Sequence, residues 1–294
     1  MDKMNYIKLA LSITLLLPLL WGCGSDSRSN AGGGDVVQPE PEPGLDISDV
    51  ELTAEEKALL ATIEDNIQAH RYAAATTDIV ALLEAHPGSE QIKRLYSDVL
   101  AMQSGMAPSD FAVKVGAVPI QVADENGDMI EVFASTALKD ILIEQAAVED
   151  SDDYQVRFLN GRQALRLRLE GKTVSELPTR EQADIGVMAS IHATRLAYAA
   201  VGGAAELEYL EEHPEELEST VAGHLPEVEQ ELVETLKVVV ETSEAVHQHY
   251  PIRELDENPV GMSMAKNAFA NTMLDDGALS TEEMVDLYDF AYGR

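Results

Sequence analysis

The residues best suited to chemistry form a basic cluster in the middle of an acidic chain. Arg157, Arg162, Arg166, Arg168 and Lys172 fall within one predicted helix whose apolar residues are spread around its whole circumference. Arg162 and Arg166 share one side of this helix, and Arg157, Arg168 and Lys172 share another. If the helix is buried, some guanidinium groups must point toward the interior, where each needs a carboxylate partner.

Two kinds of carboxylate could pair with these arginines. One is the carboxylate of a bound ligand, in which case Arg157, Arg162 and Arg166 contribute to a ligand-binding site. The other, which is more common, is a Glu or Asp of the chain itself. Arg195 stands alone on a predicted Ala-rich helix and has the same two alternatives.

No pattern in the sequence indicates catalysis or a metal centre. His247 and His249 are two residues apart and would point to different sides of a helix, and His192 has no His, Asp or Glu three or four residues away. A Gly-rich phosphate loop, an HExxH pattern and a nucleophile elbow are all missing from the sequence. We therefore expect no catalytic residue, no metal and no cofactor, and we interpret His192 as a packed side chain.

Residues 117–133 interrupt the helical pattern. Apolar residues alternate on both sides of Asn126-Gly127, which predicts a β-hairpin, although an irregular connection between helices is also possible. A calcium loop is a weaker alternative based on Asp124 and Asp128. The glycine is misplaced for the sharp turn of such a loop, and Ser135 stands where the last carboxylate should be.

Composition and charge exclude several classes of partner. The 294 residues include 53 acidic and 20 basic ones, so the formal net charge is -33. Such a charge disfavours nucleic acid, and it also disfavours adsorption to anionic lipid without a covalent anchor. The low aromatic content of 5% and the abundance of Ala, Leu and Glu favour closely packed helices.

Acidic residues are densest between Leu196 and Leu236. This interval contains no Lys or Arg and eleven Glu, at positions 206, 208, 211, 212, 215, 216, 218, 227, 229, 231 and 234. Like charges at this density repel one another unless water or cations surround them. A solvated outer face is the simpler interpretation, and a docking surface for a basic partner is the alternative.

The N-terminal segment predicts export. Lys3 and Lys8 precede an uncharged, largely apolar run from Leu9 to Trp21, which is shorter than the roughly 20 residues that cross a bilayer. The segment ends at Gly22-Cys23, and Cys23 is the single cysteine of the chain. A lone thiol excludes an intrachain disulfide.

This ending resembles the lipobox of bacterial lipoprotein signal peptides, although Trp21 is bulkier than the Ala, Ser or Thr usual in that family. The resemblance implies a signal peptide over residues 1–22, cleavage after Gly22 and a diacylglycerol group on the Cys23 sulfur. Gly24 stands where an Asp retains enterobacterial lipoproteins in the inner membrane. The resemblance therefore favours the outer membrane, with the protein facing the periplasm.

Residues 23–50 and 51–116 form the next two predicted regions. Residues 24–50 are rich in Gly, Ser, Pro and acids and predict a disordered tether. Thr53 and Glu56 form a capping-box pattern at the start of a first helix. A second helix is predicted over residues 72–85, and a third from Ser89 to Gly105.

The spacing of the first two helices resembles a tetratricopeptide repeat. We count back from Pro87 over the period of this repeat, about 34 residues. Leu59 and Ile79 then take large apolar positions, Tyr72 the aromatic position and Ala75 the small position of the pattern. Thr62 and Asn66 do not match it. An ordinary pair of antiparallel helices is the alternative. Residues 96–111 and 177–197 resemble tetratricopeptide lipoproteins associated with TRAP transporters, which are helical, periplasmic and proposed to hand ligands to a transport system.

Residues 117–294 are predicted to form one helical bundle that packs on the preceding region. We expect helices at 135–149, 153–170, 206–212, 214–222, 226–249, 262–274 and 281–292. Another is expected to start at Pro178-Thr179, with Thr179 and Gln182 as capping pair, and to end at Gly202-Gly203. Its small residues predict a central core helix. Ser280 and Glu283 should cap the last helix, although this stretch also resembles the back half of an EF-hand.

The sequence thus predicts an all-α fold of tetratricopeptide-like hairpins followed by an irregular bundle, with one small β-hairpin as an option. The function expected is that of a non-enzymatic, membrane-anchored lipoprotein, a scaffold or adaptor for another envelope protein. The alternative is a solute-binding accessory of a transport system that recognises a carboxylated ligand.

Overall fold

The fold is all-α apart from one two-stranded ribbon, as the sequence predicts. The computed structural model describes residues 50–110, 120–123, 129–132, 152–203, 206, 209–210, 212–249 and 277–285. Among these residues, no helix combines the length and the apolar character needed to cross a membrane. The helices expected at 135–149 and 262–274 lie outside the described residues.

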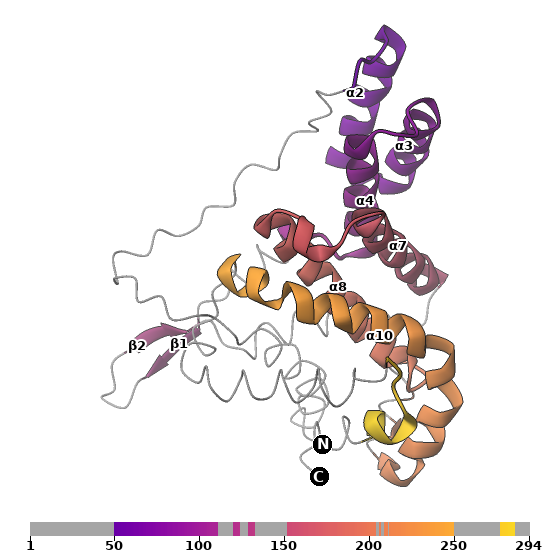
Figure 1. Cartoon of the computed structure of the whole chain (residues 1–294), viewed down its shortest axis with the longest axis vertical. Coiled ribbons are helices and arrows are strands. Elements are labelled where there is room, and N and C mark those ends of the chain that lie inside the picture. Colours follow the sequence, from indigo (N-terminus) through magenta and orange to yellow (C-terminus); the bar gives the residue numbers. More distant parts are fainter. Residues whose placement is uncertain are drawn as a thin grey trace.

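Three helices form one end of the molecule: α2 (Ala54–Gln68), α3 (Tyr72–Ala85) and α4 (Glu90–Ser104) (Figure 1). The predicted capping box is present at the start of α2, where Thr53 and Glu56 satisfy each other's backbone amides. The Ser89 side chain caps α4, and Gly105 ends it in the left-handed conformation at φ 68°. All three boundaries agree with the prediction because local caps set them.

The core between these helices contains the predicted inward residues. Ile63, Ala75, Ile79 and Leu82 are buried together with apolar residues of α4. Asn66, which does not match the tetratricopeptide pattern, is also buried, and its amide donates a hydrogen bond to Asp78 at 3.3 Å. The chain therefore satisfies a polar group at this position with a neighbouring carboxylate instead of filling it with a large apolar side chain.

The β-hairpin alternative for residues 117–133 is the one that the structure adopts. Strand β1 (Ile120–Ala123) pairs with β2 (Met129–Val132) in antiparallel register, with Ala123 opposite Met129. Residues 124–128, which include Asn126-Gly127 and the positions considered for calcium, connect the strands but lie outside the described residues.

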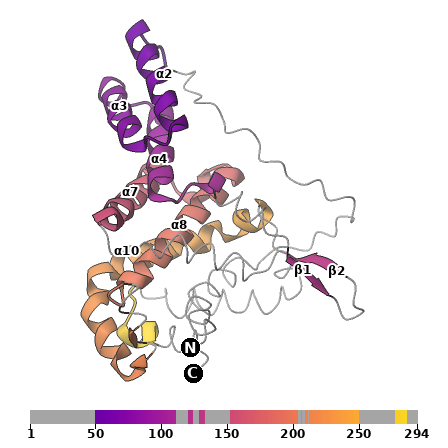
Figure 2. The ribbon, with the colours of Figure 1, turned by 180° about the vertical axis from the view of Figure 1, so that it is seen from behind.

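Helices α7 (Asp152–Leu169), α8 (Thr179–Ala199) and α10 (Leu217–His249) make up the rest of the described core. Helix α7 packs on α4, and α10 packs along α8 (Figure 2). Nearly every side chain of α8 from Ala183 to Tyr198 is buried, which confirms that it is the central helix. Burial also raises the pKa of Tyr198 to about 12.

Glycine lets α8 and α10 approach each other closely. A Cβ atom at Gly186 would overlap Val246 Cγ2 and lie 2.6 Å from Thr242 Oγ1, both on α10. Only a residue without a side chain fits at this crossing. The predicted role of the small residues on α8 is thus confirmed at a specific contact.

The helix start predicted at Pro226 is wrong, and so is the capping pair predicted for α8, although α8 begins at Thr179 as predicted. The separate helices expected at 214–222 and 226–249 are a short 3-10 turn, η2 (Pro214–Glu216), followed by one 33-residue helix that passes through Pro226. Apolar residues on both sides of this proline, among them Val221, Leu225 and Leu232, are buried against the core and hold the helix together. At the start of α8, the N-cap is Pro178 without a side-chain cap, and Gln182 instead donates to the Leu177 carbonyl oxygen at 2.7 Å.

The final described segment matches the prediction for its start. Residues 281–285 are helical, and Glu283 accepts hydrogen bonds from the backbone amide and hydroxyl of Ser280, both at 2.7 Å. The cap interpretation of this stretch is therefore confirmed. A short 3-10 turn, η1 (Val174–Glu176), connects α7 and α8.

Candidate functional site: buried charge at the helix junctions

Three helices bring a buried polar cluster together at the centre of the bundle. Arg162 comes from α7, His192 from the buried middle of α8, and Glu231 from α10. The exposed fractions of their side chains are 31%, 1% and 20%, so the cluster runs from a half-buried edge to a sealed interior. We call these three residues the Arg–Glu–His cluster.

Glu231 is the centre of this cluster. Its Oε1 atom lies 2.8 Å from His192 Nε2 and accepts a hydrogen bond from Arg162 Nε at 2.6 Å. Arg162 Nη2 contacts the other carboxylate oxygen, so the Arg and Glu side chains pair through both oxygens. The Arg162 guanidinium also lies 5.1 Å from the centroid of the Phe158 ring, which packs against the His192 ring at 5.0 Å.

The protonation states follow from these contacts. Burial opposes ionisation of Glu231, but the hydrogen bonds from His192 and Arg162 outweigh burial and lower its pKa. At His192, burial lowers the pKa, and it outweighs the opposing hydrogen bond and charge of Glu231; Arg195 and Arg162 lower the pKa further. Glu231 is therefore a carboxylate and His192 is neutral, with its proton on the Nε2 atom that faces Glu231.

A second buried cation, Arg168, joins α7 to α4 and α8. Its side chain is 5% exposed, its Nη2 atom contacts Asp98, and its Nη1 atom lies 3.3 Å from Glu181 Oε1. The Nε atom donates to Ser97 Oγ at 3.2 Å, and Ser97 in turn donates to the Ala164 carbonyl oxygen. Arg168 is thus surrounded by acceptors of the chain itself.

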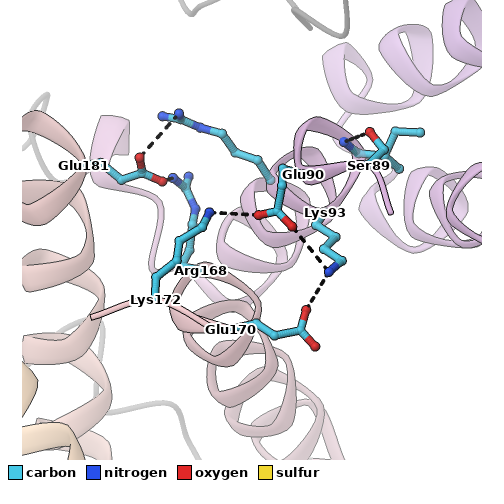
Figure 3. A network of polar contacts seen from close by, with 9 residues as sticks. Ser89, Glu90, Lys93, Arg168, Glu170, Lys172 and Glu181 are labelled. Carbon is cyan, nitrogen blue, oxygen red and sulfur yellow. Dashed lines mark hydrogen bonds and ion pairs between the residues drawn. The ribbon is translucent and has the colours of Figure 1, made fainter. Parts of the chain in front are cut away.

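A surface network continues from this junction along α4 and α7 (Figure 3). Lys172 Nζ lies 2.8 Å from Glu90, and Lys93 Nζ lies 2.9 Å from Glu170 and 3.5 Å from Glu90. The hydrogen bond to Lys172 lowers the pKa of Glu90, and the hydrogen bond to Glu170 raises the pKa of Lys93. These pairs fix how α4 and α7 lie against each other, but each is exposed enough to contribute little stability.

Arg195 points to the end of a helix. Its guanidinium donates to the carbonyl oxygen of Ser104, the last residue of α4, at 2.5 Å. The carbonyl groups at a helix C-terminus are unsatisfied and carry partial negative charge, so a buried cation is favourable there. The sequence alternatives considered only carboxylates and missed this backbone acceptor.

The remaining candidate arginines lie on the surface. Arg157 and Arg166 are both exposed on α7. The structure therefore does not bring Arg157, Arg162, Arg166 and Arg195 into one site. Arg162 has the intramolecular carboxylate partner that was one of its two alternatives, and ligand binding by any of the four stays a prediction.

Of the nine described glutamates between Leu196 and Leu236, six are exposed, in agreement with a solvated face. Glu206, Glu229 and Glu231 are half-buried, and Glu229 accepts a hydrogen bond from the Leu279 backbone amide at 3.1 Å. Near the start of this face, single ligand atoms of His213, Glu215 and Glu216 lie within 4.8 Å of one another. Tyr209 stacks on His213 and donates to Glu216 at 3.1 Å, and His213 Nδ1 lies 3.6 Å from Glu215 Oε1.

Several predicted positions lie outside the described residues. They include Gly22, Cys23 and the tether, and the side chains of His247 and His249. Searches against family models, curated proteins and solved structures found no match to this chain.

Proposed function

We propose that this protein is a bacterial lipoprotein that is anchored by an acylated Cys23 and acts as a non-enzymatic helical scaffold or adaptor for another envelope protein. The observation that carries the proposal is the N-terminus: a basic start, an apolar run and then the only cysteine of the chain. A lone cysteine at that point is expected if lipid attaches there and if no disulfide is needed elsewhere.

The helical architecture supports a binding role over a catalytic one. Successive antiparallel helices present long side-chain surfaces, which repeat-like proteins use to hold partners. In the described part of the bundle, His192 pairs with Glu231 and Arg168 with Glu181, in each case between two helices. Groups used in this way stabilise the fold instead of facing a substrate.

The net charge of the protein favours a partner with a basic surface. With a net charge of -33 and an exposed acidic face along α10, the protein would attract a basic protein surface and repel nucleic acid or anionic headgroups. The covalent lipid would then supply the membrane attachment that this charge opposes. We place the protein on the periplasmic side of the outer membrane, with the inner membrane as the less favoured location.

The solute-binding alternative has weaker support. It requires arginines that face a ligand's carboxylate, whereas Arg162 and Arg168 already contact carboxylates of the chain. Arg157 and Arg166 remain as surface candidates for such a ligand.

Metabolic labelling with radioactive palmitate in a bacterial host tests the anchor. We expect label on the wild-type protein and none on Cys23→Ser. A matched control combines Cys23→Ser with Ser25→Cys, which keeps one thiol but moves it by two residues, and it should also stay unlabelled. Equal labelling of wild type and Cys23→Ser would contradict the anchor.

Crosslinking in cells followed by purification tests the adaptor role separately. We expect the wild-type protein to recover a defined envelope protein with a basic surface, and recovery should fall when exposed Glu residues of α10, such as Glu227 and Glu234, are changed to Gln. Recovery of no envelope protein would argue against an adaptor even if the lipid is present.

A further inference from the structure

In the Arg–Glu–His cluster, the Nδ1 atom of His192 can make stability depend on pH. His192 uses Nε2 to reach Glu231, but its Nδ1 atom is buried and has no hydrogen-bond partner among the residues that the structure describes. A neutral imidazole tolerates this, because an unprotonated Nδ1 is only an unsatisfied acceptor. A second proton would convert it into a buried N–H donor with nothing to receive the bond.

The charges around His192 act on a second proton in opposite directions: Glu231 favours it, whereas Arg195 and Arg162 oppose it. Glu231 from α10 is the one carboxylate in contact with the ring in the described structure, and Arg162 from α7 already pairs with both of its oxygens. Arg195, on α8 itself, and Arg162 both disfavour a positive imidazole. Phe158 covers one side of the ring and offers no acceptor. A protonated His192 would therefore add a positive charge near two arginines, and its one neighbouring carboxylate in the described structure, Glu231, is already paired with Arg162.

We propose that His192 makes the junction of α7, α8 and α10 acid-sensitive: protonation of its buried Nδ1 atom creates a donor without an acceptor and so destabilises the packing of these three helices. The packing of these helices is most stable while His192 is neutral, and it becomes less stable when the imidazole gains its second proton. This inference rests on the contacts of the described residues and holds whether or not Cys23 is acylated.

The direction of the effect follows from linkage. Because burial lowers the pKa of His192 below its ordinary value of 6.5, the unfolded chain binds this proton at a higher pH than the folded chain. The stabilising contribution is complete above about pH 6.5 and falls as the pH decreases toward the lowered pKa. In this window the unfolding equilibrium constant should rise by up to about tenfold for each pH unit.

Denaturant unfolding of the full chain in detergent, measured between pH 7 and pH 5, tests the proposal. We expect wild type to lose stability across this range more steeply than His192→Gln, because glutamine can donate to Glu231 but cannot gain a proton. His224→Gln is the matched control, since His224 lies exposed on α10, and its profile should follow wild type. Equal slopes for wild type and His192→Gln, or an equal change in His224→Gln, would overturn the proposal.

Hydrogen exchange of the wild-type protein gives an independent measurement, which applies even if His192→Gln does not fold. After correction for the intrinsic pH dependence of exchange, we expect amides of α7 and α10 to lose protection between pH 7 and pH 5 before amides of α2 and α3. A uniform loss of protection across all these helices, or no loss, would contradict an acid-sensitive junction at His192.

Discussion

At the scale of single residues, Glu231 satisfies two different donors with one carboxylate. His192 and Arg162, which are 39 and 69 residues away from it in sequence, both direct N–H groups at it. If the carboxylate is removed, a half-buried guanidinium and a fully buried imidazole both lose their acceptor. The cost of such a change comes mainly from the donors left behind.

Glu231→Ala is therefore expected to destabilise the protein by about 2–3 kcal/mol at pH 7. Glu227→Ala is the control on the same helix, because Glu227 is exposed, and it should change the free energy of unfolding by less than about 0.5 kcal/mol. Urea denaturation followed by circular dichroism measures both. Equal effects of the two substitutions would mean that Glu231 does not hold the junction.

At the scale of elements, packing overrides the local helix preference of one residue in α10 and of one in α8. On α10, buried residues on both sides of Pro226 keep a single helix where the proline predicts a break. On α8, Gly186 is a poor helix former, yet it is required because the neighbouring helix passes over it. The contact between these two helices determines both features.

Two glycines in helices allow a matched test of this contact. Gly186→Ala should destabilise the protein by about 1–3 kcal/mol, because the added methyl group overlaps Val246 and Thr242. Gly223→Ala, on α10 with nothing within 4 Å of the added atom, should stabilise it by up to about 1 kcal/mol through helix propensity. Thermal unfolding of both variants would measure the opposite signs, and stabilisation by Gly186→Ala would contradict the close crossing.

At the scale of the whole molecule, α4 connects two hydrophobic cores. Ile92, Leu95 and Val99 belong to the core of α2 and α3, whereas Leu100 and Ala101 belong to the core around α8. Arg168 reinforces this connection because it reaches α4 and α8 from α7. The boundary predicted between residues 116 and 117 thus lies after α4 in the chain, whereas α4 itself packs into both cores.

Arg168→Met is expected to destabilise the protein by about 2–3 kcal/mol, because Asp98 loses its contacting cation and Glu181 keeps only Arg94, at 3.8 Å. Arg166→Met, two residues earlier and exposed, should stay within about 0.5 kcal/mol of wild type. Hydrogen exchange would show whether protection falls on both sides of α4 in Arg168→Met. A loss confined to α2 and α3 would mean that Arg168 does not couple the two cores.

The sequence by itself determined those features whose causes lie within a few residues. Thr53 with Glu56 and Ser280 with Glu283 set helix starts because each cap and its partner are three residues apart. Ser89 and Gly105 set the two ends of α4, each through bonds to residues three or four positions away. The small residues of α8 predicted a buried central helix, and alternating apolar residues predicted the ribbon of β1 and β2. Periodicity and capping are local signals, so these predictions were confirmed.

Only the tertiary structure decided which charged groups meet. His192 and Glu231 are 39 residues apart, Arg168 and Asp98 are 70 apart, and Arg195 reaches a backbone carbonyl 91 residues away. No spacing rule connects such residues, because their distance depends on how whole helices pack. The same reason explains Pro226, since the burial of residues around a proline is settled by the neighbouring helix and not by the proline itself.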